Sequence, residues 1–194
     1  MTPRFLIPAL LTLAPLAFAQ STEFGVLAGV SSSAATVTAP GVSVSAGTTA
    51  SVLVDFALRL KETPNGNLYF ELPAARVHKA NVGVSADRVT AGDAQFFFTP
   101  GLRYEFAPHA RVSPYAVGGF GFGWFDGADV QVNGPIRVNV VDGFKPAAGV
   151  GAGAEIHISR RVGFRFEVRD FINCAAGIAS RNHVAFNGGL GFRF

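Results

Sequence analysis

Residues 162–169 read Val-Gly-Phe-Arg-Phe-Glu-Val-Arg, with an apolar side chain at every second position and a polar or small one between. Strict alternation with a period of two is typical of a β-strand that has one apolar face. Residues 184–194 repeat the pattern, with apolar side chains or glycine at the even positions. Both segments are therefore predicted to be strands.

Six further segments alternate in the same way, so the chain is predicted to contain eight strands. Their cores lie near residues 24–30, 52–60, 68–76, 94–106, 114–125 and 146–158. The connections alternate between short ones, near 61–67, 107–113 and 159–161, and long ones, near 31–49, 77–93, 127–143 and 171–183. Short turns at one end and longer loops at the other are typical of antiparallel outer-membrane barrels, with both termini in the periplasm.

The distribution of aromatic residues decides which face of the strands points outward. The chain has 19 Phe residues. The even-numbered face is apolar in all eight segments and carries Phe in seven of them, the exception being 146–158. A soluble sandwich or lipocalin-like barrel would turn this face inward, but eight such faces would overfill a small interior. Turned outward, they form the apolar band of a membrane barrel. The predicted fold is all-β: an eight-stranded antiparallel transmembrane β-barrel with an up-and-down meander.

The first residues predict export from the cytoplasm. Arg4 is followed by an apolar run over 5–16 and by Ala17-Phe18-Ala19, which is the pattern of a secretory signal peptide. A membrane-spanning anchor is less consistent with this run, because it is short and contains two prolines. We expect a signal peptide over 1–19, with Ala17 and Ala19 as the cleavage signal, and a barrel domain over 20–194 in the cell outer membrane.

Several stretches resemble small outer-membrane β-barrel proteins of the outer-membrane protein A barrel, opacity-protein and outer-membrane protein W type. They are Pro-Gly-Leu-Arg-Tyr-Glu-Phe at 100–106, the glycine-aromatic run at 114–123, residues 162–170 and Gly-Leu-Gly-Phe-Arg-Phe at 189–194. The resemblance implies the same fold, with outer-membrane lipids and lipopolysaccharide around the barrel. Functions vary widely among such barrels, so the fold alone implies no activity.

The last stretch is the most specific part of the resemblance. In these families, a final aromatic residue with apolar residues at alternating upstream positions is read by the barrel-assembly machinery. The resemblance implies that role for Val184, Phe186, Leu190, Phe192 and Phe194, whereas Gly188 departs from the pattern.

The odd-numbered faces carry the charge and predict a polar barrel interior. The expected lumen charge network consists of Asp55, Arg59, Lys61, Glu71, Arg103, Glu105, Glu155, Arg165, Glu167, Arg169 and Arg193. One interpretation is a polar pore lining, and the other is a paired network that plugs the lumen. Eight strands leave an interior just wide enough for side chains, and unpaired buried charges are costly. The near-equal numbers of acids and bases therefore favour a plug.

Inward glycines are predicted to leave one wall of the lumen bare. They are Gly119, Gly121, Gly123, Gly149, Gly151 and Gly153. We expect this wall to make room for Arg103, Phe97 and Arg165.

The sequence predicts no catalytic residues, no cofactor and no metal site. His78 with Ser85 and Asp87, or His183 with Ser180, are the only combinations expected at the outer rim, and no nucleophile motif surrounds them. A net charge of +3 gives no reason to expect nucleic acid as a partner. We expect a non-enzymatic structural, adhesion or surface-interaction protein, whose long loops contact an unknown extracellular partner. The alternative is a narrow channel or transporter for small solutes.

Overall fold

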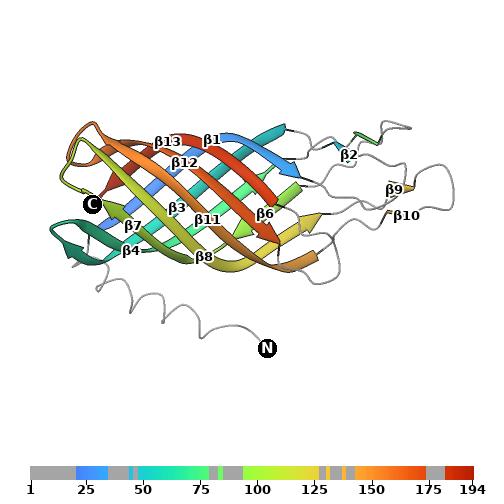
Figure 1. Ribbon diagram of the computed structural model, residues 1–194, viewed down its shortest axis with the longest axis horizontal. Helices are drawn as coiled ribbons and strands as arrows, with labels where there is room; N and C mark the ends of the chain where they lie inside the picture. The colour runs from blue at the N-terminus through green and yellow to red at the C-terminus, as the bar shows by residue number, and fades with distance from the viewer. Residues whose placement is uncertain are drawn as a thin grey trace, which may run out of the picture.

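The computed structural model describes residues 21–34, 44–45, 48–78, 83–84, 94–126, 130–131, 137–138, 143–173 and 182–194. These residues form a closed antiparallel barrel with extensions at one end (Figure 1). No helix among them is long and apolar enough to cross a membrane. The signal peptide predicted over 1–19 lies outside the described residues.

Nine segments in eight crossings make up the barrel sheet. They are β1 (Thr22–Ala34), β3 (Thr48–Thr63), β4 (Gly66–Val77), β6 (Ala94–Phe98), β7 (Gly101–Phe106), β8 (Val112–Asp126), β11 (Gly143–His157), β12 (Val162–Asn173) and β13 (Asn182–Arg193). Each crossing pairs with the next along the chain, and β13 pairs with β1 to close the cylinder. The predicted up-and-down barrel is confirmed.

β6 and β7 are two halves of one crossing, separated by Thr99 and Pro100. On both sides of the gap the register against β8 is the same, with Phe98 opposite Phe122 and Gly101 opposite Gly119. Proline has no backbone N–H to donate to the ladder. The interruption is therefore local and the two segments count as a single strand.

The two ends of the barrel differ in the length of their connections. At one end, called the turn end here, residues 64–65, 107–111 and 158–161 join consecutive strands. At the opposite end, called the loop end, the connections are longer. They contain the short pairs β2 (Val44–Ser45) with β5 (Gly83–Val84) and β9 (Val130–Gln131) with β10 (Arg137–Val138). The chain ends at the turn end (Figure 1).

The predicted faces of the strands are the observed ones. Odd-numbered side chains point into the lumen and are largely buried, whereas even-numbered ones form an apolar band on the outside. Aromatic side chains stack within this band: the Trp124 and Phe144 ring centroids are 5.7 Å apart, and those of Tyr104 and Phe106 are 4.8 Å apart. Such a band matches the requirement of a lipid environment.

One β-bulge changes the face of a predicted lumen residue. The register between β3 and β4 shifts between Arg59 and Lys61, so that Lys61 lies opposite Leu68 rather than opposite an inward-facing residue. A bulge adds one residue and reverses the alternation beyond it. Lys61 is consequently exposed, and its predicted place in the lumen network is corrected.

Candidate functional site in the barrel lumen

Charged side chains from seven of the eight crossings meet in the half of the lumen nearer the turn end. This charged layer consists of Glu23, Asp55, Glu71, Arg103, Glu105, Glu155, Arg165, Glu167, Arg169 and Arg193. All are buried except Arg193, which is half-buried. Most are predicted lumen residues, and the structure brings them together from strands far apart in sequence.

Arg165 occupies the centre of the layer. Its Nη1 atom donates to both carboxylate oxygens of Asp55, at 2.9 and 2.8 Å, and its Nη2 atom lies 3.6 Å from Glu167 Oε2. Arg169 extends the chain of ion pairs, with Nη2 at 2.6 Å from Glu71 Oε1 and Nε at 2.7 Å from Glu167 Oε1. Each central carboxylate therefore has at least one guanidinium partner.

Two more arginines continue the network toward the turn end. Arg103 donates to Glu23 and lies 3.9 Å from Glu71. Arg193 reaches three carboxylates, at 3.0 Å from Glu23 Oε1, 2.9 Å from Glu105 Oε1 and 3.2 Å from Glu155 Oε1. Arg193 lies at the end of β13, and its three partners come from β1, β7 and β11.

Two tyrosines belong to the layer, although the sequence analysis did not single them out. The Tyr69 hydroxyl donates to Glu105 Oε2 at 3.1 Å, and the Tyr115 hydroxyl donates to Glu167 Oε2 at 2.9 Å. The Arg103 guanidinium lies 4.4 Å from the Tyr69 ring centroid, and that of Arg165 lies 5.1 Å from the Tyr115 centroid. Both tyrosines lie at odd-numbered positions, which face the lumen, and this pattern could have identified them.

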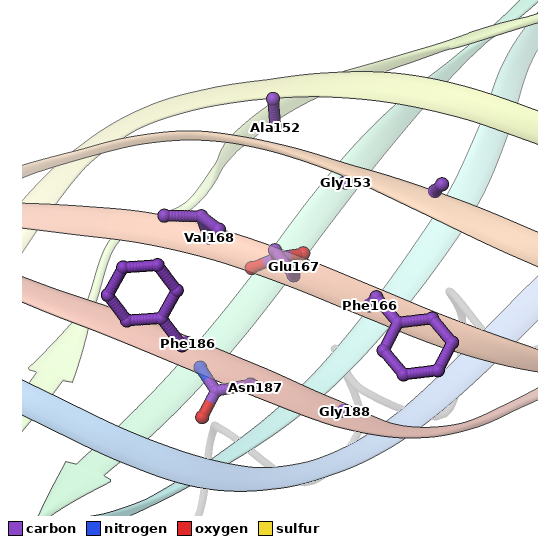
Figure 2. A pocket seen from close by; sticks show the side chains of 9 residues that line it. Ala152, Gly153, Phe166, Glu167, Val168, Phe186, Asn187 and Gly188 are labelled. Atoms are coloured by element: carbon purple, nitrogen blue, oxygen red, sulfur yellow. The ribbon is translucent and has the colours of Figure 1, made fainter.

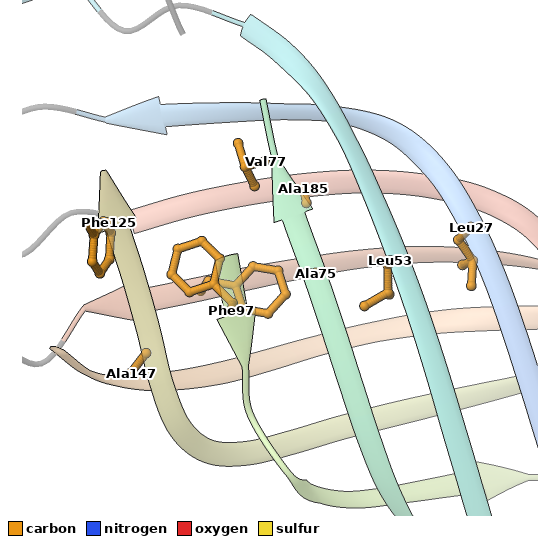
Figure 3. Close-up of a cluster of buried hydrophobic side chains, with 9 residues drawn as sticks. Leu27, Leu53, Ala75, Val77, Phe97, Phe125, Ala147 and Ala185 are labelled. Atoms are coloured by element: carbon orange, nitrogen blue, oxygen red, sulfur yellow. The ribbon is translucent and has the colours of Figure 1, made fainter. Parts of the chain in front are cut away.

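An apolar layer fills the lumen on the loop side of the charged layer (Figure 3). It consists of Leu27, Leu53, Ala75, Val77, Phe97, Phe125, Phe171, Ala147 and Ala185. The Phe97 ring stacks on Phe171 at 4.7 Å and meets Phe125 edge-on at 5.6 Å. The expected interior was polar apart from Phe97, so an apolar layer of this extent is a finding of the structure.

The inward glycines make room for Phe97, as expected, and for side chains that were not expected. A methyl group at Gly123 would meet the rings of Phe125 and Phe97, and one at Gly153 would meet Tyr115. The glycines that leave room for Arg165 are Gly25 on β1 and Gly191 on β13. The predicted glycine wall on β8 and β11 does not have this role.

Arg59, the other basic residue predicted on β3, lies at the turn-end rim. Its Nη1 atom pairs with Glu62 Oε2 at 2.9 Å, and both side chains are partly exposed. With Arg59 and Lys61 outside it, the charged layer holds six carboxylates and four guanidinium groups among the residues that the structure describes. The expected near-balance of charge is corrected to an excess of acid.

The outer face has a shallow depression over β11, β12 and β13, with a volume of about 510 Å³ (Figure 2). Phe166, Val168, Phe186 and Ala152 face outward around it, while the Glu167 side chain points into the barrel. Its lining is mainly apolar, as expected of a wall against lipid.

The two histidines predicted at the outer rim lie in different surroundings. His183 lies on β13 rather than in a loop, and it is buried beside the Phe97 and Phe125 rings at centroid distances of 5.3 and 6.3 Å. His78 is exposed at the end of β4. The residues that were considered with them, Ser85, Asp87 and Ser180, lie outside the described residues.

The residues predicted as the assembly signal lie along the outward face of β13. Phe186 and Leu190 are exposed, Val184 and Phe192 are half-buried, and Phe194 follows the strand with 77% of its surface exposed. Gly188 interrupts the row beside Phe166, whose ring a methyl group at Gly188 would touch at 3.4 Å.

Comparison with known proteins agrees with this architecture. No curated protein sequence matches the chain significantly. Among solved structures, Neisserial surface protein A (NspA) is similar with a TM-score of 0.64 and 12% identity, over 89% of this chain and 97% of that one. OprG from Pseudomonas aeruginosa gives 0.60 and 14%, over 90% and 97%. The outer membrane enzyme PagL gives 0.51 and 15%, over 89% and 98%.

These likenesses show a shared fold, and the fold alone does not separate enzymes from other barrels, since PagL has it too. The family model described as "Outer membrane protein beta-barrel domain" matches residues 5–194. The chain is thus an outer-membrane protein, and it belongs to the outer membrane protein β-barrel domain family.

Proposed function

We propose that the protein is a non-enzymatic barrel of the outer membrane that acts as a structural, adhesion or surface-interaction protein rather than as a conduit. The observation that carries this proposal is the presence of two layers of buried side chains in the lumen. The charged layer and the apolar layer follow one another along the axis, and each is made of buried side chains.

The two layers oppose ion passage for different physical reasons. In the charged layer, an ion would have to separate buried pairs such as Arg165 with Asp55, and breaking a buried pair costs about 3–5 kcal/mol. In the apolar layer, Phe97, Phe125 and Phe171 offer an ion no polar contact to replace its water. A barrel of eight strands has little width to spare beyond these side chains.

The positions of His109 and His183 support a non-enzymatic role. General base catalysis needs a nucleophile within hydrogen-bonding reach of the base. His183 is enclosed by aromatic rings in the lumen, and His109 is exposed at the turn end. Both environments favour structural roles for these side chains.

We place the interaction surface at the loop end, because the connections there are long and the barrel wall itself faces lipid. The expected surroundings of the wall are lipids and lipopolysaccharide, and the expected partner of the loops is extracellular. The outward row on β13 that ends in Phe194 is the proposed contact with the barrel-assembly machinery.

Planar-bilayer conductance of the refolded protein tests this function. The wild type should show little steady conductance, whereas Arg165→Ala combined with Arg169→Ala should produce cation-preferring openings, because it removes two guanidinium groups and leaves Glu167 without an arginine partner. Arg160→Ala with Arg161→Ala is the matched control: it removes the same charge from exposed positions and should leave conductance low.

Steady conductance of the wild type that the double substitution does not alter would overturn the proposal. The narrow channel for small solutes would then replace it.

A further inference from the structure

Three potential metal ligands converge where β7 and β11 approach the turn end. His157 Nε2 lies 3.8 Å from Glu105 Oε1 and 3.9 Å from Glu155 Oε1. The three donor atoms all lie within 4.8 Å of one another. Glu155 and His157 are two positions apart on the inward face of one strand, and β8 separates them from Glu105.

The hydrogen bonding of His157 defines what its ring offers to the cluster. Its Nδ1 atom lies 2.9 Å from the Ala110 carbonyl oxygen. A carbonyl can only accept, so Nδ1 carries a proton, and Nε2 is the ring atom that faces the two carboxylates. A ring N–H held by a backbone carbonyl is the usual outer contact of a metal-bound histidine.

The second, independent observation concerns Glu155. Its side chain is 97% buried, and its Oε1 atom accepts no hydrogen bond. Arg193 Nη2 is 3.2 Å away but is not aligned to donate. A buried carboxylate oxygen without a hydrogen bond is costly, and this one lies 3.9 Å from His157 Nε2.

The net charge of the charged layer also favours a bound cation. Among the described residues it has six carboxylates against four guanidinium groups, an excess of two negative charges that a divalent cation would neutralise. A cavity of about 120 Å³ at the turn end has Glu105 and Arg193 in its wall together with the half-exposed Arg59 and Glu62. This cavity connects the turn-end surface with Glu105, one of the three potential ligands.

We propose that Glu105, Glu155 and His157 bind one divalent first-row transition ion of the Zn²⁺ type at the turn end of the lumen. One imidazole nitrogen and two carboxylate oxygens suit such an ion, and a water molecule would complete four-fold coordination. Bonds of about 2.1 Å place tetrahedral donors roughly 3.4 Å apart, so the two measured separations from Nε2 need to close by only a few tenths of an ångström.

On binding, the ion would replace the Arg193 guanidinium as the partner of Glu155. The guanidinium would give up Glu155 and keep Glu23 and Glu105, to which it is hydrogen-bonded at 3.0 and 2.9 Å. The proposal does not depend on whether the lumen conducts, because the cluster lies at the end of the charged layer.

Calorimetric titration of the refolded, metal-free protein with Zn²⁺ tests the site. We expect one equivalent to bind. Glu155→Gln and His157→Gln should each weaken binding at least about tenfold. His78→Gln is the matched control: it removes an exposed histidine at the loop end of the barrel, away from the cluster, and should bind as the wild type does.

X-ray absorption of the zinc-loaded wild type gives a readout that requires no variant to fold. One imidazole nitrogen with oxygen ligands at about 2.0–2.2 Å is expected. The proposal is overturned if the wild type binds no Zn²⁺, if the spectrum contains no imidazole, or if folded His157→Gln binds with unchanged affinity.

Discussion

Arg165 and Asp55 are 110 positions apart in sequence, yet both oxygens of the Asp55 carboxylate accept hydrogen bonds from Arg165 Nη1, at 2.9 and 2.8 Å. The two residues come from β12 and β3, which are separated by β13 and β1 around the barrel wall. The pair therefore crosses the lumen, and it connects the last third of the chain to the first.

This pair should show strong energetic coupling. In a double-mutant cycle of Asp55→Ala and Arg165→Ala, each single change should cost about 3–5 kcal/mol of unfolding free energy, because it leaves a buried charge without its partner. The double variant should lose much less than the sum. Urea denaturation in lipid vesicles measures all four free energies.

The partly exposed pair of Arg59 and Glu62 is the control, since its ion-pair distance is also 2.9 Å. Solvent screening should hold its coupling below about 1 kcal/mol. Equal coupling in the two cycles would contradict the account of a dry charged layer.

Gly25 should not tolerate a side chain. A methyl group there would lie 2.6 Å from Arg165 Nη1 and 2.7 Å from Asp55 Oδ2, so Gly25→Ala should cost about 1–3 kcal/mol by overpacking. At Gly118, where nothing lies within 4 Å of the added carbon, alanine should be neutral or slightly stabilising. Thermal unfolding of both variants in the same detergent makes the comparison, and a neutral Gly25→Ala would argue against close packing.

Phe166 tests the lipid-facing wall. Its side chain is 54% exposed on the outward face of β12, near the middle of the strand. Phe166→Arg should lower the free energy of unfolding in vesicles by about 2–4 kcal/mol, since an arginine there would face hydrocarbon. Arg160→Glu, a charge change in an exposed turn, should have little effect. Similar stabilities for the two variants would be incompatible with an outward membrane band.

Phe194 tests the proposed assembly signal separately from stability. Its backbone N–H donates to the Thr22 carbonyl at 2.9 Å, but its side chain is mostly exposed. Phe194→Ala should therefore leave the stability of refolded protein nearly unchanged, while it slows insertion in cells and increases periplasmic degradation. Pulse-chase analysis of the outer-membrane fraction measures this.

Phe106→Ala is the matched control, because it removes an exposed aromatic side chain at the same end of the barrel. Normal insertion of the Phe194 variant, or equally slow insertion of both, would count against a specific role for the last residue.

The sequence by itself determined the strands and their faces. Alternation such as that of 162–169 has a period of two, which only an extended strand converts into one apolar and one polar face. Because the even-numbered face is apolar in every segment and carries Phe in seven of the eight, membrane exposure of that face was predictable without any knowledge of contacts. Length differences among the connections then predicted the two ends.

Tertiary structure alone decided which side chains meet inside. Alternation places Asp55 and Arg165 on the inward face, but it does not specify their height, which depends on strand tilt and on the register that closes the barrel. For the same reason the sequence did not predict the separation into charged and apolar layers, or the proximity of Glu105 to His157. At Lys61 even the face was unpredictable, because one extra residue in the bulge reverses the alternation and nothing in the local pattern marks it.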